Sequence, residues 1–493
     1  MSFTILQKRL SFFSTSLFAI TAAGFILRVL AARGELWLDE IWSLMLLEDV
    51  SAAHEIFWNI SNANNHYLNS LWLWITGPDA PVVWQRFASI LLGTATIPAA
   101  ALFIRRRAGD AAGLATAIVF AFGYIFVLYG SEARGYAGLV LMIVLSADAA
   151  DRVIEAPQST APAVQFALFV ALGSLFHLIM IVAVGVVGAG AAILLGRDLE
   201  RWRDHLVTLL RLTIAALLGL LPAILCFFVG VSIRPYVAGN RALFSYPDLA
   251  EGLAGMARAT LGLPVALSDV QTLLVVAPLA AGALLLGPAR LRAPSIIAFV
   301  LLPLLEILFR APNLYYARFH LPIACFLALL AGAGIGVLWT RGGWRRGLAL
   351  ALGAAGLIGH GALVAELLAF GRGDGAGAVA EMAKAGHARF DSDLPTETSW
   401  MVAYHLRRSA RQDLALTPTR GDCETPPDWF IASNWRESRP ALRDQEIFGP
   451  AACPRTFIRV AHYPSARLSG FDWTLYRRSP DEGSTLDAPL ISH

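Results

Sequence analysis

Two adjacent carboxylates are placed where an acidic side chain could serve as a general base. Asp39 and Glu40 follow the first apolar run of the chain, and Trp37 and Trp42 bracket them. These apolar neighbours would hold a carboxylate in a partly desolvated cleft, an environment in which proton abstraction is effective. Acids beside an apolar run also occur simply because they face water. The pair alone therefore does not decide between a catalytic group and a solvated surface.

A second polar cluster follows in the sequence NANNHYLNS. It contains His66 and Tyr67, with asparagine at positions 62, 64, 65 and 69. Clustered asparagines suit a surface that binds hydroxyl groups. They are equally typical of a loop of turn-forming residues beside interfacial aromatic side chains.

An isolated arginine occurs in the short connection YGSEARGY. Tyr129, Glu132, Arg134 and Tyr136 all fall within it, between two apolar runs. A cation in such a place needs a partner. The guanidinium group matches phosphate oxygens as a fork, which favours a lipid phosphate as that partner. Glu132 is the competing partner.

A second arginine of this kind, Arg318, precedes a later apolar run. Tyr315, Tyr316 and His320 stand beside it. Two separated cations with one pair of carboxylates suit a reaction that expels an anionic phosphate. Two residues are secondary candidates for the same site: Arg28, inside the first apolar run, and His177, near the end of the fifth. A lone histidine on an apolar helix is more often a packed, hydrogen-bonded residue than a ligand.

The composition of the chain indicates a membrane protein. Of the 493 residues, 56% are hydrophobic and 15% are charged, whereas a soluble chain carries about 25% charged residues. The net charge is only +3, and no basic tract indicates a nucleic-acid partner. The lipid bilayer is the expected partner.

Apolar runs of about twenty residues predict an all-α polytopic membrane protein with about eleven transmembrane helices. The first run follows Lys8 and Arg9 and continues to about Ala32 without a small-residue cleavage site, so we expect it to be retained. The predicted spans are 11–32, 82–104, 111–130, 135–150, 162–180, 180–196, 206–230, 270–287, 294–309, 320–340 and 347–370.

Clustered basic residues predict the orientation of these helices, because short cytoplasmic loops are rich in lysine and arginine. The clusters fall in alternate connections, which places the N-terminus in the cytoplasm and the tail outside. The basic residues concerned are Lys8, Arg9, Arg105, Arg106, Arg107, Arg152, Arg197, Arg201, Arg203, Arg290, Arg292, Arg341, Arg345 and Arg346. The expected outer loops are 33–80, 131–134, 231–269 and 310–319.

The character of the chain changes after Phe370. Residues 371–493 are polar and contain short strand-like runs, at Trp429-Phe-Ile-Ala and Thr456-Phe-Ile-Arg-Val. We predict a transmembrane domain at 1–370 and a small soluble α/β domain at 371–493. If the tail faces an oxidising space, Cys423 and Cys453 form a disulfide. Cys226 and Cys325 lie in apolar runs and are expected to be core thiols.

Several motifs are missing from the sequence. It contains no GxGxxG, GxxxxGK[ST], HExxH or CxxC pattern. The predicted cytoplasmic loops are too short for a nucleotide-binding domain. If the chain transfers a sugar, we therefore expect the donor to be embedded in the membrane.

These segments, taken in order, resemble the polytopic GT-C glycosyltransferases that use lipid-linked sugars. The nearest branch contains bacterial protein mannosyltransferase-like enzymes and the aminoarabinose transferases of lipid A. The resemblance rests on the Asp39-Glu40 pair, QRFASILLG at 85–93, YGSEARGY at 129–136, RFHLPI at 318–323 and the soluble tail. It covers essentially the whole membrane part. The chain departs from the branch after His66, where the usual prolines are missing.

The resemblance implies a role for each candidate residue. Asp39 would take the proton from the acceptor hydroxyl, and Glu40 would orient Asp39 or bind sugar. Cations would hold the phosphate of a polyprenyl-phosphate sugar, and tyrosines would line the cleft. The implied phosphate-binding residues are Arg134, Arg318, His66, Tyr136 and Tyr316. No cofactor is certain. A divalent cation between Asp39 and Glu132 would fit, although nothing in the sequence requires one.

The resemblance further implies an inverting transfer at the periplasmic face of a bacterial inner membrane. The acceptor stays open among a glycolipid, a polysaccharide and a protein. Two alternatives come from other classes of protein. A lipid or solute transporter or flippase would be expected to place charges at the midplane and to show internal repeats. A membrane scaffold whose tail binds a partner leaves the paired acids and outer arginines unexplained.

Overall fold

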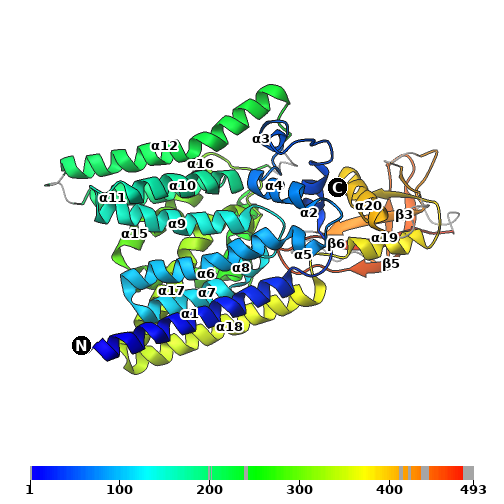
Figure 1. The fold of residues 1–493 in the computed structure, drawn as a ribbon. Coiled ribbons are helices and arrows are strands. Elements are labelled where there is room, and N and C mark those ends of the chain that lie inside the picture. Colours follow the sequence, from blue (N-terminus) through cyan, green and yellow to red (C-terminus); the bar gives the residue numbers. More distant parts are fainter. Residues whose placement is uncertain are drawn as a thin grey trace. The chain divides into compact units, whose positions relative to one another are not determined.

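The computed structural model describes residues 3–197, 200, 202–237, 243–409, 415–419, 423–434 and 443–480, with side chains from residue 12 onward. Contacts divide the chain into two compact units (Figure 1). The membrane unit comprises residues 1–32 and 49–365, and the C-terminal unit comprises residues 33–48 and 366–493. Among the basic residues that indicate the orientation, Arg201 and the side chains of Lys8 and Arg9 lie outside the described residues.

Helices dominate the membrane unit, and each predicted apolar run forms one or more of them. Within the described part of the chain, seven helical segments are long and apolar enough to cross a membrane, and α7, α10 and α11 are shorter apolar helices. The helices on these runs are α1 (Phe3–Ala31), α5 (Val82–Gln85), α6 (Phe87–Ala108), α7 (Asp110–Phe122), α8 (Tyr124–Tyr129), α9 (Tyr136–Glu155), α10 (Ala161–Phe176), α11 (Met180–Leu195), α12 (Trp202–Ile233), α14 (Asp269–Leu286), α15 (Ala289–Ile296), η2 (Ile297–Leu301), α16 (Leu302–Leu308), α17 (Leu321–Arg341) and α18 (Gly343–Phe370).

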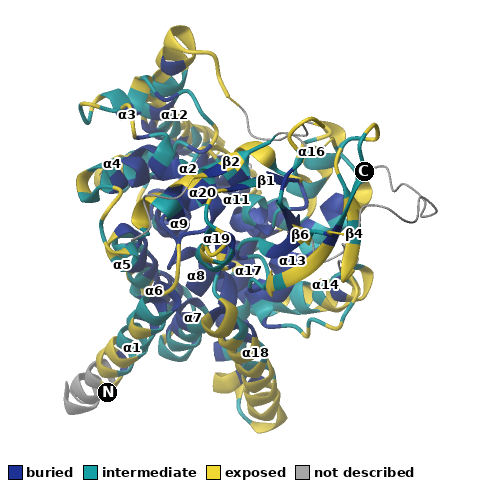
Figure 2. Cartoon of the chain, turned by 90° about the vertical axis from the view of Figure 1, so that its right-hand side faces the viewer, coloured by how far each residue is buried: buried dark blue, intermediate teal, exposed yellow. Residues whose placement is uncertain are grey.

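The surface of these helices confirms that the chain is a multi-pass membrane protein. Helix α12 exposes Leu210, Leu217 and Leu218 by 57%, 61% and 60%. Helix α18 is exposed along much of its length as well (Figure 2). Its residue Ile358 is 74% exposed. Apolar surface of this extent is unfavourable in water and is solvated by lipid. Helix α17 is instead buried by its neighbours, since 83% of its most apolar stretch lies inside the unit.

The predicted span at 111–130 is broken into α7 and α8 at Gly123. The backbone there leaves the helical region with φ −58° and ψ 123°. A Cβ atom on Gly123 would lie 2.5 Å from the carbonyl oxygen of Val119, so a larger residue does not fit. The break leaves the last carbonyl groups of α7 without partners in their own helix.

Several short helices occupy segments that we expected to be loops. The segment 33–80 contains α2 (Leu38–Met45), α3 (Glu55–Trp58) and α4 (Tyr67–Thr76), and the segment 231–269 contains α13 (Tyr246–Leu261). The hydroxyl of Ser245 caps α13 by accepting a hydrogen bond from the Asp248 backbone N–H at 3.1 Å. Gly262 ends α13 with φ 67°. A short 3-10 helix, η3 (Ala317–His320), precedes α17.

The C-terminal unit is an α/β structure built on a six-stranded sheet. The strand order is β2-β1-β3-β6-β5-β4. Strand β1 lies parallel to both neighbours, and the other pairs are antiparallel. Two of the strands, β3 and β5, are the strand-like runs expected from the sequence. The elements are α19 (Gly375–Ala383), β1 (Ala388–Ser392), α20 (Pro395–Arg408), β2 (Leu416–Pro418), β3 (Trp429–Asn434), β4 (Gln445–Phe448), β5 (Arg455–Tyr463) and β6 (Asp472–Arg478).

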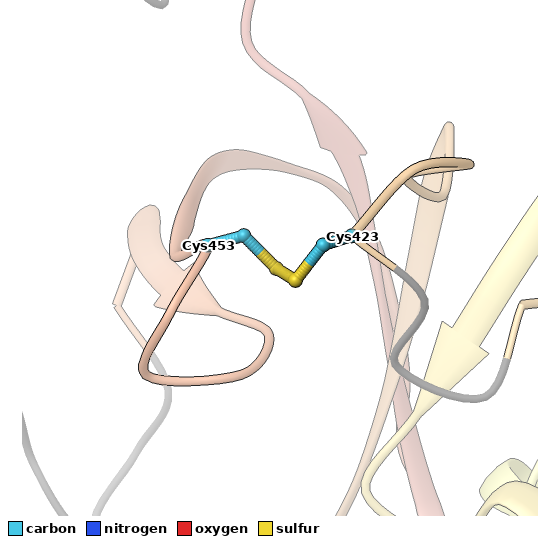
Figure 3. The surroundings of a disulfide bond; sticks show 2 residues. All are labelled: Cys423 and Cys453. Carbon is cyan, nitrogen blue, oxygen red and sulfur yellow. A yellow bond between two sulfur atoms is a disulfide. The ribbon is translucent and has the colours of Figure 1, made fainter.

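Aromatic side chains form the core on one face of this sheet. Phe430, Phe457 and Tyr476 are buried together, and Phe448 stacks on Phe430 with ring centres 3.8 Å apart. A disulfide joins Cys423 to Cys453 across two loops of this unit, with Cα atoms 5.8 Å apart (Figure 3). The other two cysteines are free thiols: Cys325 is buried and Cys226 is partly exposed.

The segment 33–48 belongs to the C-terminal unit, although more than 300 residues separate the two along the chain. Trp42 of α2 stacks on Trp400 of α20 with ring centres 5.6 Å apart. Arg407 and Glu48 form an ion pair at 2.7 Å. The predicted first outer loop is thus divided, and its first part belongs to the same compact unit as the tail.

Candidate active site

Gly135 brings two segments of the membrane unit into close contact. It lies at the N-terminus of α9, at the end of the turn that contains Arg134. A Cβ atom at this position would lie 2.0 Å from the carbonyl oxygen of Phe176 and 2.8 Å from Nδ1 of His66. Only glycine allows this approach. The YGSEARGY turn, the start of α4 and the end of α10 therefore meet at one place.

The Arg134 side chain is almost fully buried at this meeting point. Its Nη2 atom donates a hydrogen bond to Oδ1 of Asn64 at 2.6 Å and lies 3.2 Å from Nε2 of His66. Its Cζ atom is 4.9 Å from the centre of the Tyr136 ring. Nη1 of the same guanidinium forms an ion pair with the Glu132 carboxylate at 3.9 Å. Asn64 and His66 thus help to orient Arg134.

His66 is held as a neutral imidazole. Its Nδ1 atom lies 3.2 Å from the carbonyl oxygen of Phe176, so this nitrogen carries the proton and donates. Nε2 then accepts from Arg134. Burial, followed by the charges of His177 and Arg134, holds the pKa of His66 well below its usual value. Since both ring nitrogens contact protein groups, His66 helps to hold the cation, and its direct contact with phosphate stays a prediction.

His177 lies in the turn between α10 and α11 and completes an aromatic cluster. Its ring centre is 4.7 Å from that of His66 and 4.9 Å from that of Tyr136. Its Nδ1 atom accepts a hydrogen bond from the Ile179 backbone N–H at 3.1 Å. Burial and the charges of Arg134 and Arg318 lower the pKa of His177 to about 3. The imidazole is therefore neutral, and Arg318 acts on the same site.

Arg318 is carried by η3, directly before α17. Its Cζ atom lies 3.9 Å from the centre of the Tyr316 ring, a close cation–π contact. His320, two residues further along the chain, makes contacts that hold this segment in place. Its Nε2 atom lies 2.9 Å from the carbonyl oxygen of Leu314, and its Nδ1 atom lies 3.4 Å from the Glu306 carboxylate.

Hydrogen bonds from two further side chains hold the turn that presents Arg134. Asn69 donates to the carbonyl oxygen of Ala133 at 2.8 Å, and Ser89 donates to that of Arg134 at 3.1 Å. Asn69 and Asn64 come from the asparagine cluster, for which the sequence left a hydroxyl-binding surface and a loop of turn-forming residues equally open. In the structure these two asparagines position the site itself.

The QRFASILLG segment at 85–93 serves the same framework. Besides Ser89, Arg86 donates to the carbonyl oxygen of Ala32 at 3.0 Å, and Gln85 donates to that of Gly77 at 3.0 Å. Gly93 leaves room for the Arg28 side chain, since a Cβ atom there would lie 2.9 Å from Nε of Arg28.

Arg28, a secondary candidate for phosphate binding, has a different place in the structure. Its guanidinium donates to the carbonyl oxygens of Phe120 at 2.9 Å, Ala121 at 3.3 Å and Gly24 at 3.0 Å. The first two are carbonyl groups that the break at Gly123 leaves at the end of α7. Arg28 therefore caps a broken helix, and its secondary role in phosphate binding stays a prediction.

The predicted acids Asp39 and Glu40 belong to the C-terminal unit, in the first turn of α2. The Glu40 carboxylate is fully buried and accepts a hydrogen bond from the Trp37 backbone N–H at 3.1 Å. This contact caps the helix. Asp39 is half-buried, and its backbone carbonyl accepts a hydrogen bond from the Ser43 hydroxyl at 2.9 Å.

Within the described residues, no three His, Cys, Asp or Glu side chains gather as metal ligands would. The candidate site of the membrane unit consists of His66, Arg134, Tyr136 and His177, with Glu132 at 3.9 Å from Arg134. The charge of Arg318 contributes to the lowered pKa of both imidazoles. Such an arrangement places a buried guanidinium among neutral imidazoles and an aromatic ring. It suits the binding of an anion such as a phosphate group.

No protein-family model matches the sequence, and no curated protein matches it. The fold is similar to that of solved structures. ArnT from Cupriavidus metallidurans in the apo state aligns with a TM-score of 0.55 at 12% identity, over 85% of this chain and 93% of that chain. The same protein bound to undecaprenyl phosphate aligns with a TM-score of 0.52 at 12% identity, over 97% and 99%. The chain thus has the GT-C fold.

Proposed function

We propose that this chain is a membrane glycosyltransferase that moves a sugar from a polyprenyl-phosphate carrier to an acceptor hydroxyl. The observation that carries the proposal is the buried Arg134 guanidinium, which donates to Oδ1 of Asn64 and to the unprotonated Nε2 atom of His66. A fold similar to that of ArnT, which has been solved with undecaprenyl phosphate, supports it. Arg134 and Arg318 would hold the donor phosphate, and Tyr136 and Tyr316 would line its cleft.

The proposed chemistry is an inverting displacement at the anomeric carbon. Asp39 takes the proton from the acceptor hydroxyl as its oxygen forms a bond to the anomeric carbon. The bond between that carbon and the phosphate oxygen breaks, and its electron pair stays on the phosphate. The leaving polyprenyl phosphate gains one negative charge, which Arg134 and Arg318 stabilise. Glu40 orients the segment that carries Asp39.

The positive-inside pattern supports a location for this reaction. With the N-terminus in the cytoplasm, the Arg134 turn and the C-terminal unit lie on the periplasmic side of a bacterial inner membrane. The disulfide between Cys423 and Cys453 agrees with an oxidising compartment. The acceptor is a glycolipid, a polysaccharide or a protein hydroxyl of the cell envelope.

The test is turnover of radiolabelled undecaprenyl-phosphate hexose by the full chain in nanodiscs, with envelope extract as acceptor. Asp39→Asn keeps the shape of the side chain and removes the base. We expect it to lose about two to four orders of magnitude in rate while it still binds undecaprenyl phosphate. Asp49→Asn, an exposed acid of the membrane unit, is the control and should retain activity. Equal turnover by Asp39→Asn and wild type would remove Asp39 from the mechanism.

A further inference from the structure

A cleft lined in part by His66 and His177 opens beside the Arg134 site. Its walls are the segment before α4, the turn between α10 and α11, and the C-terminal half of α12. Two backbone hydrogen bonds join the segment before α4 to the segment that follows α12. They run from Ala63 N–H to the Val237 carbonyl at 3.0 Å and from Val237 N–H to the Ser61 carbonyl at 2.9 Å.

The cleft and the Arg134 site share the side chain of His66. His66 and His177 both line the cleft, and His66 accepts the hydrogen bond from Arg134 on its Nε2 atom. A ligand with its anionic end at Arg134 would therefore have its adjoining group against these two rings. In a polyprenyl-phosphate sugar, the group adjoining the phosphate is the sugar ring.

The lining of the cleft is polar but uncharged. Among the described residues that line it there is no Asp, Glu, Lys or Arg. The only titratable imidazoles are those of His66 and His177, whose pKa values are lowered by burial, so both are neutral at physiological pH. An ammonium or carboxylate group placed here would lose its hydration without gaining an opposite charge, which is costly. The cleft therefore favours a neutral ligand.

A sugar ring has apolar C–H faces and polar hydroxyl groups, and the same lining suits both. The aromatic rings of Tyr67, Phe227 and Tyr236 can pack on apolar C–H faces, and Phe227 and Tyr236 already form an edge contact at 5.4 Å. The amide of Asn62 can bind hydroxyl groups. In the described part of the chain, the Ser61 hydroxyl is buried without a hydrogen-bond partner, which leaves it available for one.

We propose that this cleft binds the uncharged sugar ring of the lipid-linked donor and discriminates against sugars that carry an amino or carboxylate group. The inference rests on the proposed function, since it needs the donor phosphate at Arg134. It narrows the substrate from any polyprenyl-phosphate sugar to one with a neutral hexose or pentose.

Cys226 provides a native probe for the test. It lines the cleft and is partly exposed, whereas Cys325 is fully buried and Cys423 is joined to Cys453. The full chain in nanodiscs is treated with methyl methanethiosulfonate, and modification of Cys226 is followed by intact mass. Undecaprenyl-phosphate glucose at saturation should slow the modification about tenfold. Undecaprenyl phosphate alone, and undecaprenyl-phosphate 4-amino-4-deoxyarabinose, should each slow it less than twofold.

A substitution that fills the cleft gives an independent measurement. Gly230 lines the cleft, and the nearest atom to a Cβ there is the Trp58 carbonyl oxygen at 3.5 Å, so a side chain fits the backbone and would occupy the cleft. Gly230→Leu should weaken binding of undecaprenyl-phosphate glucose at least tenfold and should leave binding of undecaprenyl phosphate within twofold. Gly185→Leu, the same change on an exposed position of α11 with nothing within 4 Å of its Cβ, is the matched control.

The outcomes separate the two proposals. If undecaprenyl phosphate protects Cys226 as well as the glucosyl lipid does, the cleft holds the carrier chain and the inference is wrong. If the aminoarabinose lipid protects equally, the discrimination by charge is wrong. If none of the three lipids binds at all, by mass spectrometry of the nanodiscs, the proposed glycosyltransferase function itself fails.

Discussion

Nε2 of His66 accepts a hydrogen bond from the Arg134 guanidinium at 3.2 Å, while Nδ1 of the same ring faces the Phe176 carbonyl oxygen at 3.2 Å. This pairing fixes the tautomer and makes the imidazole an acceptor toward the cation. A protonated imidazole would repel Arg134. The positive charge of the site is therefore carried by arginine, and the histidine determines where that charge lies.

Replacing Arg134 with alanine should weaken the binding of undecaprenyl phosphate. The loss of a buried, oriented cation should cost about 2 kcal/mol or more, which corresponds to about a thirtyfold rise in Kd. Arg134→Lys keeps the charge but loses the fork geometry, and it should fall between alanine and wild type. Binding is measured by mass spectrometry of nanodiscs with increasing lipid.

Arg345→Ala is the matched control for this series, because it removes the same charge from an exposed position of α18. Its Kd should equal that of the wild type. If the alanine variant at position 134 melts normally and still binds the lipid as tightly as wild type does, the phosphate-binding role of this arginine is refuted.

The donor affinity should not rise as the pH falls from 8 to 5. The pKa of His66 lies well below 6.5 in the folded protein and that of His177 is about 3, so neither ring gains a proton in this interval. Undecaprenyl-phosphate glucose is the suitable ligand, because its phosphodiester keeps one charge throughout. An affinity that increased several-fold below pH 6.5 would show that a histidine becomes cationic and binds the phosphate.

The same pKa shifts have a consequence for stability. Below about pH 6.5 the unfolded chain binds protons at these histidines and the folded chain does not, so stability decreases as the pH falls toward the folded pKa values. His66→Asn removes one contributor and should show a smaller fall in melting temperature between pH 7 and pH 5. Its amide can still donate to the Phe176 carbonyl.

Arg28→Met should destabilise the membrane unit and leave donor affinity nearly unchanged. The substitution removes the donors to the carbonyl groups of Phe120 and Ala121 at the end of α7, and each buried carbonyl left without a partner costs about 1–3 kcal/mol. A clear drop in the melting temperature in detergent is the expected result. A thirtyfold loss of lipid affinity with normal melting would instead support a phosphate-binding role for Arg28.

The helices of the membrane unit could be predicted because long apolar runs have no other way to satisfy their backbone in lipid. The break at Gly123 was missed, since residues 111–130 are apolar on both sides of it. Helix α13 was missed as well, although Ser245 at its start and Gly262 at its end are ordinary capping signals. Its apolar residues are fewer than a span requires.

The gathering of His66, Arg134, Tyr136 and His177 could be anticipated in part, because their segments fall in loops on the same predicted face. The sequence could not show what each side chain contacts. The asparagine cluster illustrates this limit, since Asn64 orients Arg134 and Asn69 holds the turn. Arg28 illustrates it too, because a cation in an apolar run looks the same whether it binds a ligand or caps a helix. The catalytic roles of Asp39 and Glu40 stay predictions.

The pairing of Trp42 with Trp400 places a constraint on the order of events during synthesis. Helix α2 leaves the ribosome early, but its partners in the C-terminal unit start at Glu366, so the 317 residues 49–365 separate the two parts of that unit. At about 5–20 residues per second, this gap lasts roughly 16–64 s. During that interval the apolar side of α2 has no partner from its own unit. A chain truncated before Glu366 would never supply one, so the last quarter of the polypeptide completes a structure that its first tenth begins.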